Sequence, residues 1–241
     1  MGLFLTLAFL FFVGSILGWV VELLFRAAVH PEHKWINPGF CTGPYVPLYG
    51  FGLCLLFLLA LLENRHLIAS PLGNKLATIA AMAVAMTAIE YLAGVLSIRV
   101  MKVRLWDYSK MPGNIQGIIC PQFSLIWAAV AAVYDLFVHP YILDALHWLS
   151  QNLAFSFFIG LFFGVFLIDV AHSAQIVARL KKFAEDNHVE VRYEALKADI
   201  RRRAKARAAK YNFFRPFRSD LPLSEHLKAM YESLEERRKH K

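Results

Sequence analysis

Five long apolar runs, separated by short polar segments, dominate the pattern of the chain. Their length and composition predict helices at about 3–29, 45–62, 75–98, 121–138 and 153–177. The first run opens with uncharged positions from residue 3 to residue 21, enough to cross a hydrocarbon core of about 30 Å. We therefore expect an all-α, polytopic membrane bundle of about five transmembrane helices at 1–177, followed by a basic helical tail at 178–241.

Small and polar residues fall on one side of four of the five predicted helices. On the first, Gly14 and Gly18 form a small-x-x-x-small pair, and Glu22 and Arg26 continue the same row. Such rows pack against protein rather than lipid, and residues at i and i+4 can also form an ion pair. Similar rows follow on the third helix (Ala83, Thr87, Glu90, Gly94, Ser97), the fourth (Ser124, Ala128, Ala131, Asp135, His139) and the fifth (Gly160, Gly164, Ile168, His172, with Asp169 beside them).

Two stretches rich in proline and glycine interrupt the helices. The first, 37–52, holds three prolines and four glycines, and a related stretch spans 112–127. Each follows a helix with an acid in its apolar run, Glu22 and Glu90 respectively. Irregular backbone at membrane depth is tolerated only where it is buried in protein or lines a cavity. We therefore predict a membrane-embedded polar site that these two irregular, re-entrant loops help to build.

The charges are divided unevenly along the chain. The chain is 58% hydrophobic with a mean hydropathy of +0.46, and its net charge is +8. Residues 1–177 hold eight basic and eight acidic residues, so residues 178–241 carry the whole excess. A basic segment beside a membrane attracts anionic lipid headgroups. We expect the tail to be helical to about residue 210, to break there, and to form a second short helix at 221–241.

The distribution of Lys and Arg among the loops predicts the topology. The tail and the 99–120 loop are basic, whereas the predicted interfacial loop at 139–152 has no Lys or Arg. The positive-inside rule then places the N-terminus outside and the tail in the cytoplasm, and a bacterial inner membrane is the expected location. On this topology Asp135 lies toward the outer half. The ionisable groups that lie toward the cytoplasmic side are Glu22, Glu90, Asp169 and His172.

Several motifs resemble one known family over residues 1–175. The motifs are Gly18-Trp19-Val20-Val21-Glu22, the whole 37–52 stretch, Glu90-Tyr91-Leu92-Ala93-Gly94, Trp106-Asp107-Tyr108-Ser109, residues 114–120 and Phe123-Ser124-Leu125-Ile126-Trp127. Together they resemble the ABC-transporter type IV family of bacterial integral membrane permeases (CmpB-like). The chain departs from the family pattern at Pro38, Cys41 and Pro121. The family pattern has an arginine where this chain has Pro38, so we do not expect an anion-binding role at that position.

The resemblance implies a transporter component. The chain contains no Gly-x-x-x-x-Gly-Lys-Ser/Thr phosphate loop, so an ATPase would be a separate chain, docked on the 99–120 loop or the tail. We expect no cofactor, no metal, no nucleic-acid partner and no catalytic residue; a homo-oligomer stays open. The candidate binding residues are Glu22, Arg26, Asn37, Tyr49, Glu90, Trp106, Asp107, Asn114, Asp169 and His172.

Three functions remain open. In the first, a transporter or permease-like subunit, Glu22 and Glu90 bind a cation, a proton or a cationic group, and the parallel repeat of helix and broken loop marks the site. The second is a membrane scaffold or assembly factor that works through its basic tail. In the third, a membrane-embedded enzyme processes lipid with Glu90, Asp107, Asp169 and His172 as acid–base groups.

Overall fold

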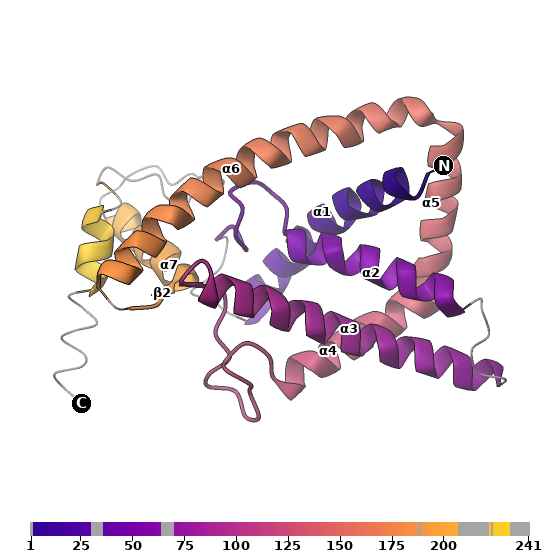
Figure 1. Cartoon of the computed structure of the whole chain (residues 1–241), viewed down its shortest axis with the longest axis horizontal. Helices are drawn as coiled ribbons and strands as arrows, with labels where there is room; N and C mark the ends of the chain where they lie inside the picture. The colour runs from indigo at the N-terminus through magenta and orange to yellow at the C-terminus, as the bar shows by residue number, and fades with distance from the viewer. Residues whose placement is uncertain are drawn as a thin grey trace. The chain divides into compact units, whose positions relative to one another are not determined.

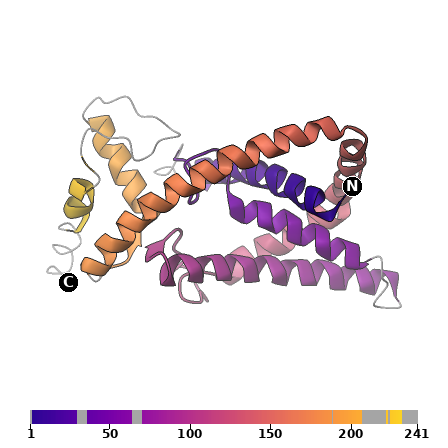
Figure 2. The same cartoon turned by 45° about the horizontal axis from the view of Figure 1, so that its top comes forward.

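The structure is a computed structural model that describes residues 2–29, 36–63, 70–187, 189–206, 222 and 224–231 (Figures 1 and 2). Helices dominate it, which confirms the all-α polytopic expectation. They are α1 (Leu3–Val29), α2 (Pro47–Glu63), α3 (Pro71–Arg99), α4 (Pro121–Val133), the π-helical η2 (Tyr134–Val138), α5 (His139–Gln151), the 3-10 turn η3 (Leu153–Phe155), α6 (Ser156–Asp186) and α7 (Tyr193–Ala206), with strands β1 (Val103–Arg104) and β2 (Val191–Arg192).

The chain divides into two compact units. The first unit comprises Met1–Trp19, Tyr45–Val95 and Asp107–Ile168, and the second comprises Val20–Pro44, Leu96–Trp106 and Asp169–Lys241. Both units draw on segments far apart in the sequence, so each is held by tertiary packing rather than by one continuous stretch. These units are defined by contacts, whereas the predicted boundary at residue 177 concerns the membrane and stays a prediction.

Glycines allow close helix packing in the first unit. A Cβ on Gly18 would lie 2.2 Å from Cβ of Tyr49, and one on Gly94 would lie 2.2 Å from Cγ2 of Ile118. Neither distance is sterically possible, so both positions need glycine. The small-x-x-x-small row of α1 is therefore a packing face, as predicted. The buried core around it comprises Leu10, Leu56, Phe57, Ala60, Met82, Met86, Trp127, Ala131, Tyr134, Ile142 and Leu146.

The segment after residue 138 corrects the sequence analysis. We expected an interfacial loop at 139–152, but the chain continues from α4 through η2 into the helix α5, which leads on to α6 (Figure 1). Pro140 lies in the first turn of α5, directly after the π-helical turn Tyr134–Val138. Ile142, Leu146 and Leu149 recur at helical spacing and are buried. Hydrophobic periodicity therefore outweighs the polar residues that indicated a loop.

The second unit has a small apolar core of its own. Strands β1 and β2 pair in parallel, with Val103 opposite Val191, and both valines are fully buried. The predicted unbroken helix to about residue 210 is wrong. The helix α6 ends at Asp186, the amide of Asn187 donates to the carbonyl of Phe183, and the chain becomes extended before α7 begins. The β-branched valines that favour a strand explain the break. Residues 224–231 are helical, within the predicted terminal helix.

The described helices have the dimensions of membrane spans. Four segments are long and apolar enough to cross a bilayer, namely Leu3–Ala28, Pro71–Arg99, Pro121–Gln151 and Leu153–Asp186. The helix α2 is apolar but has 17 residues, the lower limit for a span. On α6, Phe157, Leu161 and Ile168 expose more than half of their area. A face this apolar requires a non-aqueous surrounding.

Candidate functional site

Glu90 is the buried acid of the first unit. It lies in the apolar part of α3 and exposes 3% of its surface. Tyr108 donates its hydroxyl to Oε1 at 3.0 Å, and Trp127 donates its indole N–H to Oε2 at 2.9 Å. Both carboxylate oxygens thus accept a hydrogen bond from a neutral aromatic side chain. A carboxylate in an apolar segment is costly, so these donors are part of what holds it there.

The irregular loop before α4 places Tyr108. The side chain of Asn114 donates to the carbonyls of Ser109 and Met111 and accepts from the N–H of Gly117. The N–H of Tyr108 donates to the carbonyl of Gly117 at 2.8 Å, which closes the loop. Asn114, a predicted site residue, therefore acts on the loop backbone.

Asp107 and Gly113 complete this loop. Asp107 is exposed and accepts from the N–H and the hydroxyl of Ser109. Gly113 has a φ of +69°, a conformation that a side chain would strain. The ring of Phe123 stacks on Tyr108 with centroids 4.4 Å apart. The loop is therefore rigidly built around the tyrosine that binds Glu90.

Tyr49 lies near the same acid. Its ring centroid is 5.7 Å from that of Trp127, the indole donor to Glu90. The close contact of Tyr49 with Gly18 links the first helix to this group of aromatics. Two predicted residues of the first unit, Tyr49 and Glu90, are thus brought together through Trp127.

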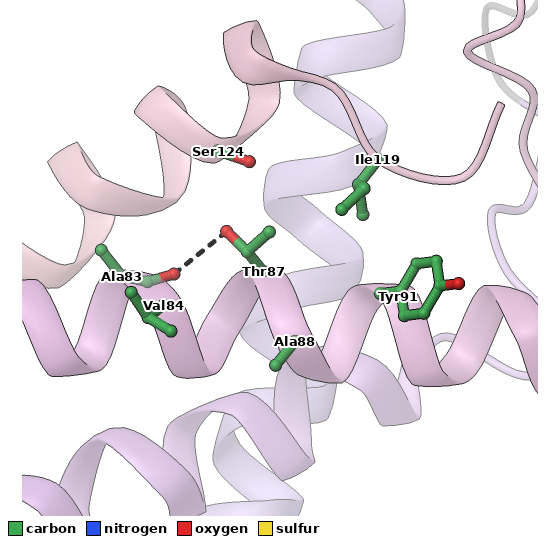
Figure 3. A pocket seen from close by; sticks show the side chains of 7 residues that line it. All are labelled: Ala83, Val84, Thr87, Ala88, Tyr91, Ile119 and Ser124. Atoms are coloured by element: carbon green, nitrogen blue, oxygen red, sulfur yellow. Dashed lines mark hydrogen bonds between the residues drawn. The ribbon is translucent and has the colours of Figure 1, made fainter. Parts of the chain in front are cut away.

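A shallow apolar groove of about 440 Å³ runs along α3 on the side of Thr87 and Tyr91 (Figure 3). The hydroxyl of Thr87 donates to the carbonyl of Ala83, one turn earlier. Because these polar groups are few, the groove fits an apolar chain better than a charged solute. Its lining residues are Ala83, Val84, Thr87, Ala88, Tyr91, Ile119 and Ser124.

The second unit contains a different polar centre, which we call the loop clamp: Asn37, Asp169, Tyr193 and Lys197 around the loop 37–44. The Asn37 amide donates to the carbonyls of Thr42 at 2.6 Å and Gly43 at 3.2 Å. Asp169 of α6 accepts from the N–H groups of Thr42 and Gly43, at 3.1 and 3.0 Å, and from the Thr42 hydroxyl. The carboxylate thus binds loop backbone.

Lys197 of α7 closes the clamp. Its ammonium donates to the carbonyls of Asn37 at 2.8 Å and Gly39 at 3.0 Å, and it lies 4.5 Å from the centroid of the Tyr193 ring. Lys197 exposes 1% of its surface. The Tyr193 hydroxyl donates to the carbonyl of Phe40 at 3.3 Å. A residue of the predicted tail therefore binds the first irregular loop directly.

The clamp also sets the chemistry of Cys41. Burial, with the nearby charge of Asp169, raises the pKa of this thiol from 9.0 to about 12, while Lys197 acts in the opposite direction. The thiol exposes 2% of its surface. Because the thiolate is the reactive form, the raised pKa makes Cys41 a poor nucleophile in the folded protein.

The remaining predicted residues take other positions in the second unit. Arg26 donates to Glu22 at 2.9 Å, the local ion pair that the sequence predicted. His172 is exposed on α6, and Trp106 is half-buried. Glu22 and Glu90 belong to different units. The common pocket for the acids expected from the sequence therefore stays a prediction.

Sequence reasoning did not select Tyr108, Trp127, Tyr193 or Lys197 as site residues. The first two lie inside motifs that carried the family resemblance, so their motif membership was an available signal. Lys197 had no such signal, because one buried lysine in a strongly basic tail looks like any other. The basic run 201–207 has no described side chains, and His30, Glu32, His33 and the 211–218 segment lie outside the described residues.

No cluster of three or more His, Cys, Asp or Glu side chains within the described part of the chain could hold a metal ion. The chemistry available at Glu90 is a buried carboxyl group whose two oxygens accept hydrogen bonds from Tyr108 and Trp127. The chemistry at the loop clamp is recognition of backbone by one carboxylate and one ammonium.

These features define an α-helical polytopic membrane protein. Residues 9–174 match the family described as "Putative ABC-transporter type IV", which covers most of the chain, and the protein belongs to this family. No curated protein and no solved structure matches the chain.

Proposed function

We propose that the protein is a membrane-embedded transporter subunit whose polar site is built on Glu90. The family assignment supports a component of an ABC transporter. The observation that carries the site is the buried Glu90 carboxylate, which accepts hydrogen bonds from Tyr108 and Trp127 inside an apolar helix. An ionisable group kept at this depth is a common mark of an ion or substrate pathway. The proposed ligand is a cation, a proton or a cationic group of a substrate.

The proposed orientation follows the charge distribution of the chain. We place the N-terminus outside, the tail in the cytoplasm and Glu90 toward the cytoplasmic side of a bacterial inner membrane. The positive-inside rule supports this arrangement, because the tail and the 99–120 loop are the most basic parts. Since the chain has no phosphate loop, a separate ATPase chain would supply nucleotide hydrolysis and would dock on one of these basic segments.

Proteoliposomes that hold the full chain test the role of Glu90. A potassium diffusion potential drives cation entry, and trapped pyranine reports internal pH. We expect Glu90→Gln to lower the proton flux about tenfold or more, because a loss of only about 1.4 kcal/mol in cation binding is a factor of ten. Glu190→Gln, at an exposed carboxylate that pairs with Arg104, is the control and should keep the wild-type rate. Equal rates for wild type and Glu90→Gln would contradict the proposal.

A second candidate, a scaffold that works through its tail, is favoured by the loop clamp. Lys197 and Tyr193 of α7 bind the backbone of the loop 37–44. A ligand that binds the basic tail, such as an anionic lipid surface, would therefore affect the conformation of this loop without itself being transported. Binding of the full chain to vesicles with and without anionic lipid tests this role, and affinity independent of lipid charge and salt would exclude it.

A further inference from the structure

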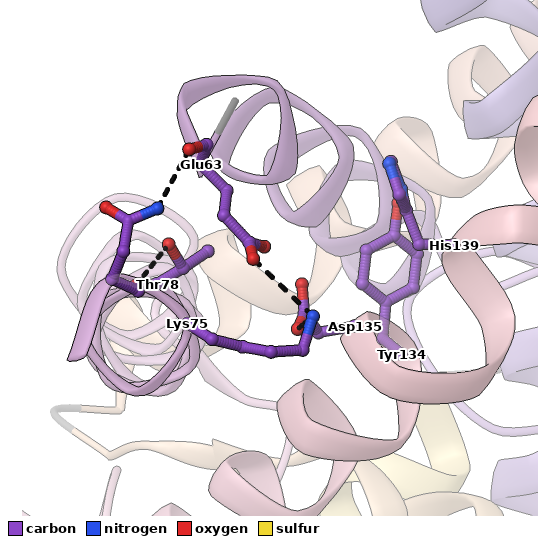
Figure 4. A network of polar contacts seen from close by, with 7 residues as sticks. Glu63, Lys75, Thr78, Tyr134, Asp135 and His139 are labelled. Atoms are coloured by element: carbon purple, nitrogen blue, oxygen red, sulfur yellow. Dashed lines mark hydrogen bonds and ion pairs between the residues drawn. The ribbon is translucent and has the colours of Figure 1, made fainter. Parts of the chain in front are cut away.

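Three charged side chains, Glu63, Lys75 and Asp135, meet in the first unit, and none of them is a member of the Glu90 site (Figure 4). The ammonium of Lys75, near the start of α3, lies 2.9 Å from Oδ2 of Asp135 and 3.5 Å from Oε1 of Glu63. Asp135 belongs to η2, and Glu63 is the last residue of α2. One ammonium group thus lies between two carboxylates from different elements.

The two sides of this ion pair differ in their freedom to move. The side chain of Asp135 is 2% exposed, whereas that of Lys75 is 36% exposed. Lys75 has a long flexible stem and can swing into its surroundings, but the carboxylate of Asp135 cannot leave the interior. Within the described residues, Oδ2 of Asp135 receives no hydrogen bond of good geometry, although the ammonium is close. The buried Asp135 carboxylate is therefore paired with an ammonium group that can move away from it.

The elements around Asp135 hold the carboxylate in place. The π-helical turn Tyr134–Val138 interrupts the long helical segment, and such turns are frequent at functional sites. The Tyr134 hydroxyl and Nδ1 of His139 are 3.1 Å apart. Among the described residues, the titratable groups that interact around this position include His139, Tyr134, Glu63 and Lys75 together with Asp135 itself. The Asn74 amide donates to the carbonyl of Glu63 at 2.8 Å and keeps that helix end close.

We propose that Asp135 and Glu63 form a binding site for a compact monovalent cation, and that the Lys75 ammonium is its tethered occupant. A cation that enters takes the position of the ammonium between the two carboxylates, and Lys75 swings outward. Sodium, potassium and ammonium share the single charge and small size that this requires. The site does not involve Glu90, so this proposal can be tested independently of the transport function proposed above.

The test is thermal unfolding of the purified full chain in detergent, followed by tryptophan fluorescence at constant pH and ionic strength. Chlorides of sodium, potassium and ammonium are compared with N-methylglucamine chloride, whose cation is too large. Lys75→Gln empties the site, so we expect a small cation at about ten times its Kd to raise Tm by about 3–6 °C. Wild type should show a smaller rise, because Lys75 competes, and Lys75→Gln/Asp135→Asn should show none.

Lys181→Gln is the matched control, since Lys181 pairs with Glu185 on an exposed face at 3.9 Å. It should show no cation-specific rise beyond that of wild type. A rise in Lys75→Gln that is equal in all four salts, or that persists after Asp135→Asn, would overturn the site. If Lys75→Gln does not purify in folded form, equilibrium dialysis of radioactive sodium compares wild type with Asp135→Asn. Sodium bound only by wild type supports the site, and equal binding overturns it.

Discussion

The Glu90 site and the loop clamp use similar parts in different ways. Each contains a proline–glycine turn with φ near +70° to +80°, at Gly39 and Gly113, beside an asparagine that gathers loop carbonyls. In the first unit, the loop then sends the tyrosine hydroxyl to an acid. In the second unit, the acid and a lysine turn back onto the loop itself.

This difference suggests a functional role for the Glu90 site and a structural role for the loop clamp. The charged groups of the loop clamp bind backbone N–H and carbonyl groups. Their removal should therefore lower the stability of the folded protein. The carboxylate of Glu90 is bound by side chains and not by the backbone. Its neutralisation should therefore change the electrostatics of the site with less effect on the backbone. The comparison predicts that charge changes cost stability in the second unit and activity in the first.

Lys197→Met should have the largest effect on stability. Methionine keeps most of the length of the stem but leaves the carbonyls of Asn37 and Gly39 without their buried donor, which should lower the free energy of unfolding by about 2–5 kcal/mol. Denaturant titration in detergent, followed by tryptophan fluorescence, measures the change. Lys181→Met, on an exposed face of α6, is the control and should cost less than about 0.5 kcal/mol. Similar values for both variants would show that the clamp is not structural.

Trp127→Phe should have the next largest effect. It removes the N–H that binds Oε2 of Glu90 and should cost about 2–3 kcal/mol, since hydrogen bonds to charged groups contribute about 1.5–3 kcal/mol. A double-mutant cycle with Glu90→Gln separates this bond from the loss of packing. We expect Trp127→Phe to cost about 1 kcal/mol less in the Glu90→Gln protein. An equal cost in both backgrounds would mean that the indole serves packing alone.

The third prediction, with the smallest expected effect on stability, uses the reactivity of the Cys41 thiol to report whether the loop clamp is intact. With a pKa of about 12, about one thiol in 10⁴ is ionised at pH 8, so iodoacetamide should label Cys41 very slowly in a Cys54→Ala/Cys120→Ala protein. Asp169→Asn, which releases the backbone of Thr42 and Gly43, should speed labelling. Fast labelling of the intact protein, measured by mass spectrometry, would contradict the buried loop.

The same thiol gives a pH dependence with a defined sign. Its pKa is about 12 in the folded protein and near 9.0 in the unfolded chain, so the folded state binds the proton more tightly. The contribution to stability is complete below pH 9 and is lost as the pH rises from 9 toward 12. The loss of stability between pH 9 and pH 11 should therefore be smaller in Cys41→Ala than in wild type.

The helical architecture could be predicted because membrane burial leaves a strong signal in the sequence. Apolar runs and small-residue rows identified α1 and α3, and the ion pair of Glu22 with Arg26 followed from their spacing alone. The helix α5 was missed, because His139, Asp144 and His147 reduce its hydropathy while Ile142, Leu146 and Leu149 still face the core. Short amphipathic helices of this kind look like loops when only hydropathy and charge are considered.

The sequence by itself determined the class of the protein, its family and the two proline–glycine loops, because these depend on composition and local backbone preference. Only the tertiary structure decided what each polar residue contacts. Asp169 and Glu90 look alike as acids in apolar runs, yet one binds backbone N–H groups and the other binds aromatic side chains. Their partners lie between 18 and 127 positions away in the chain, and no local pattern specifies such distant contacts.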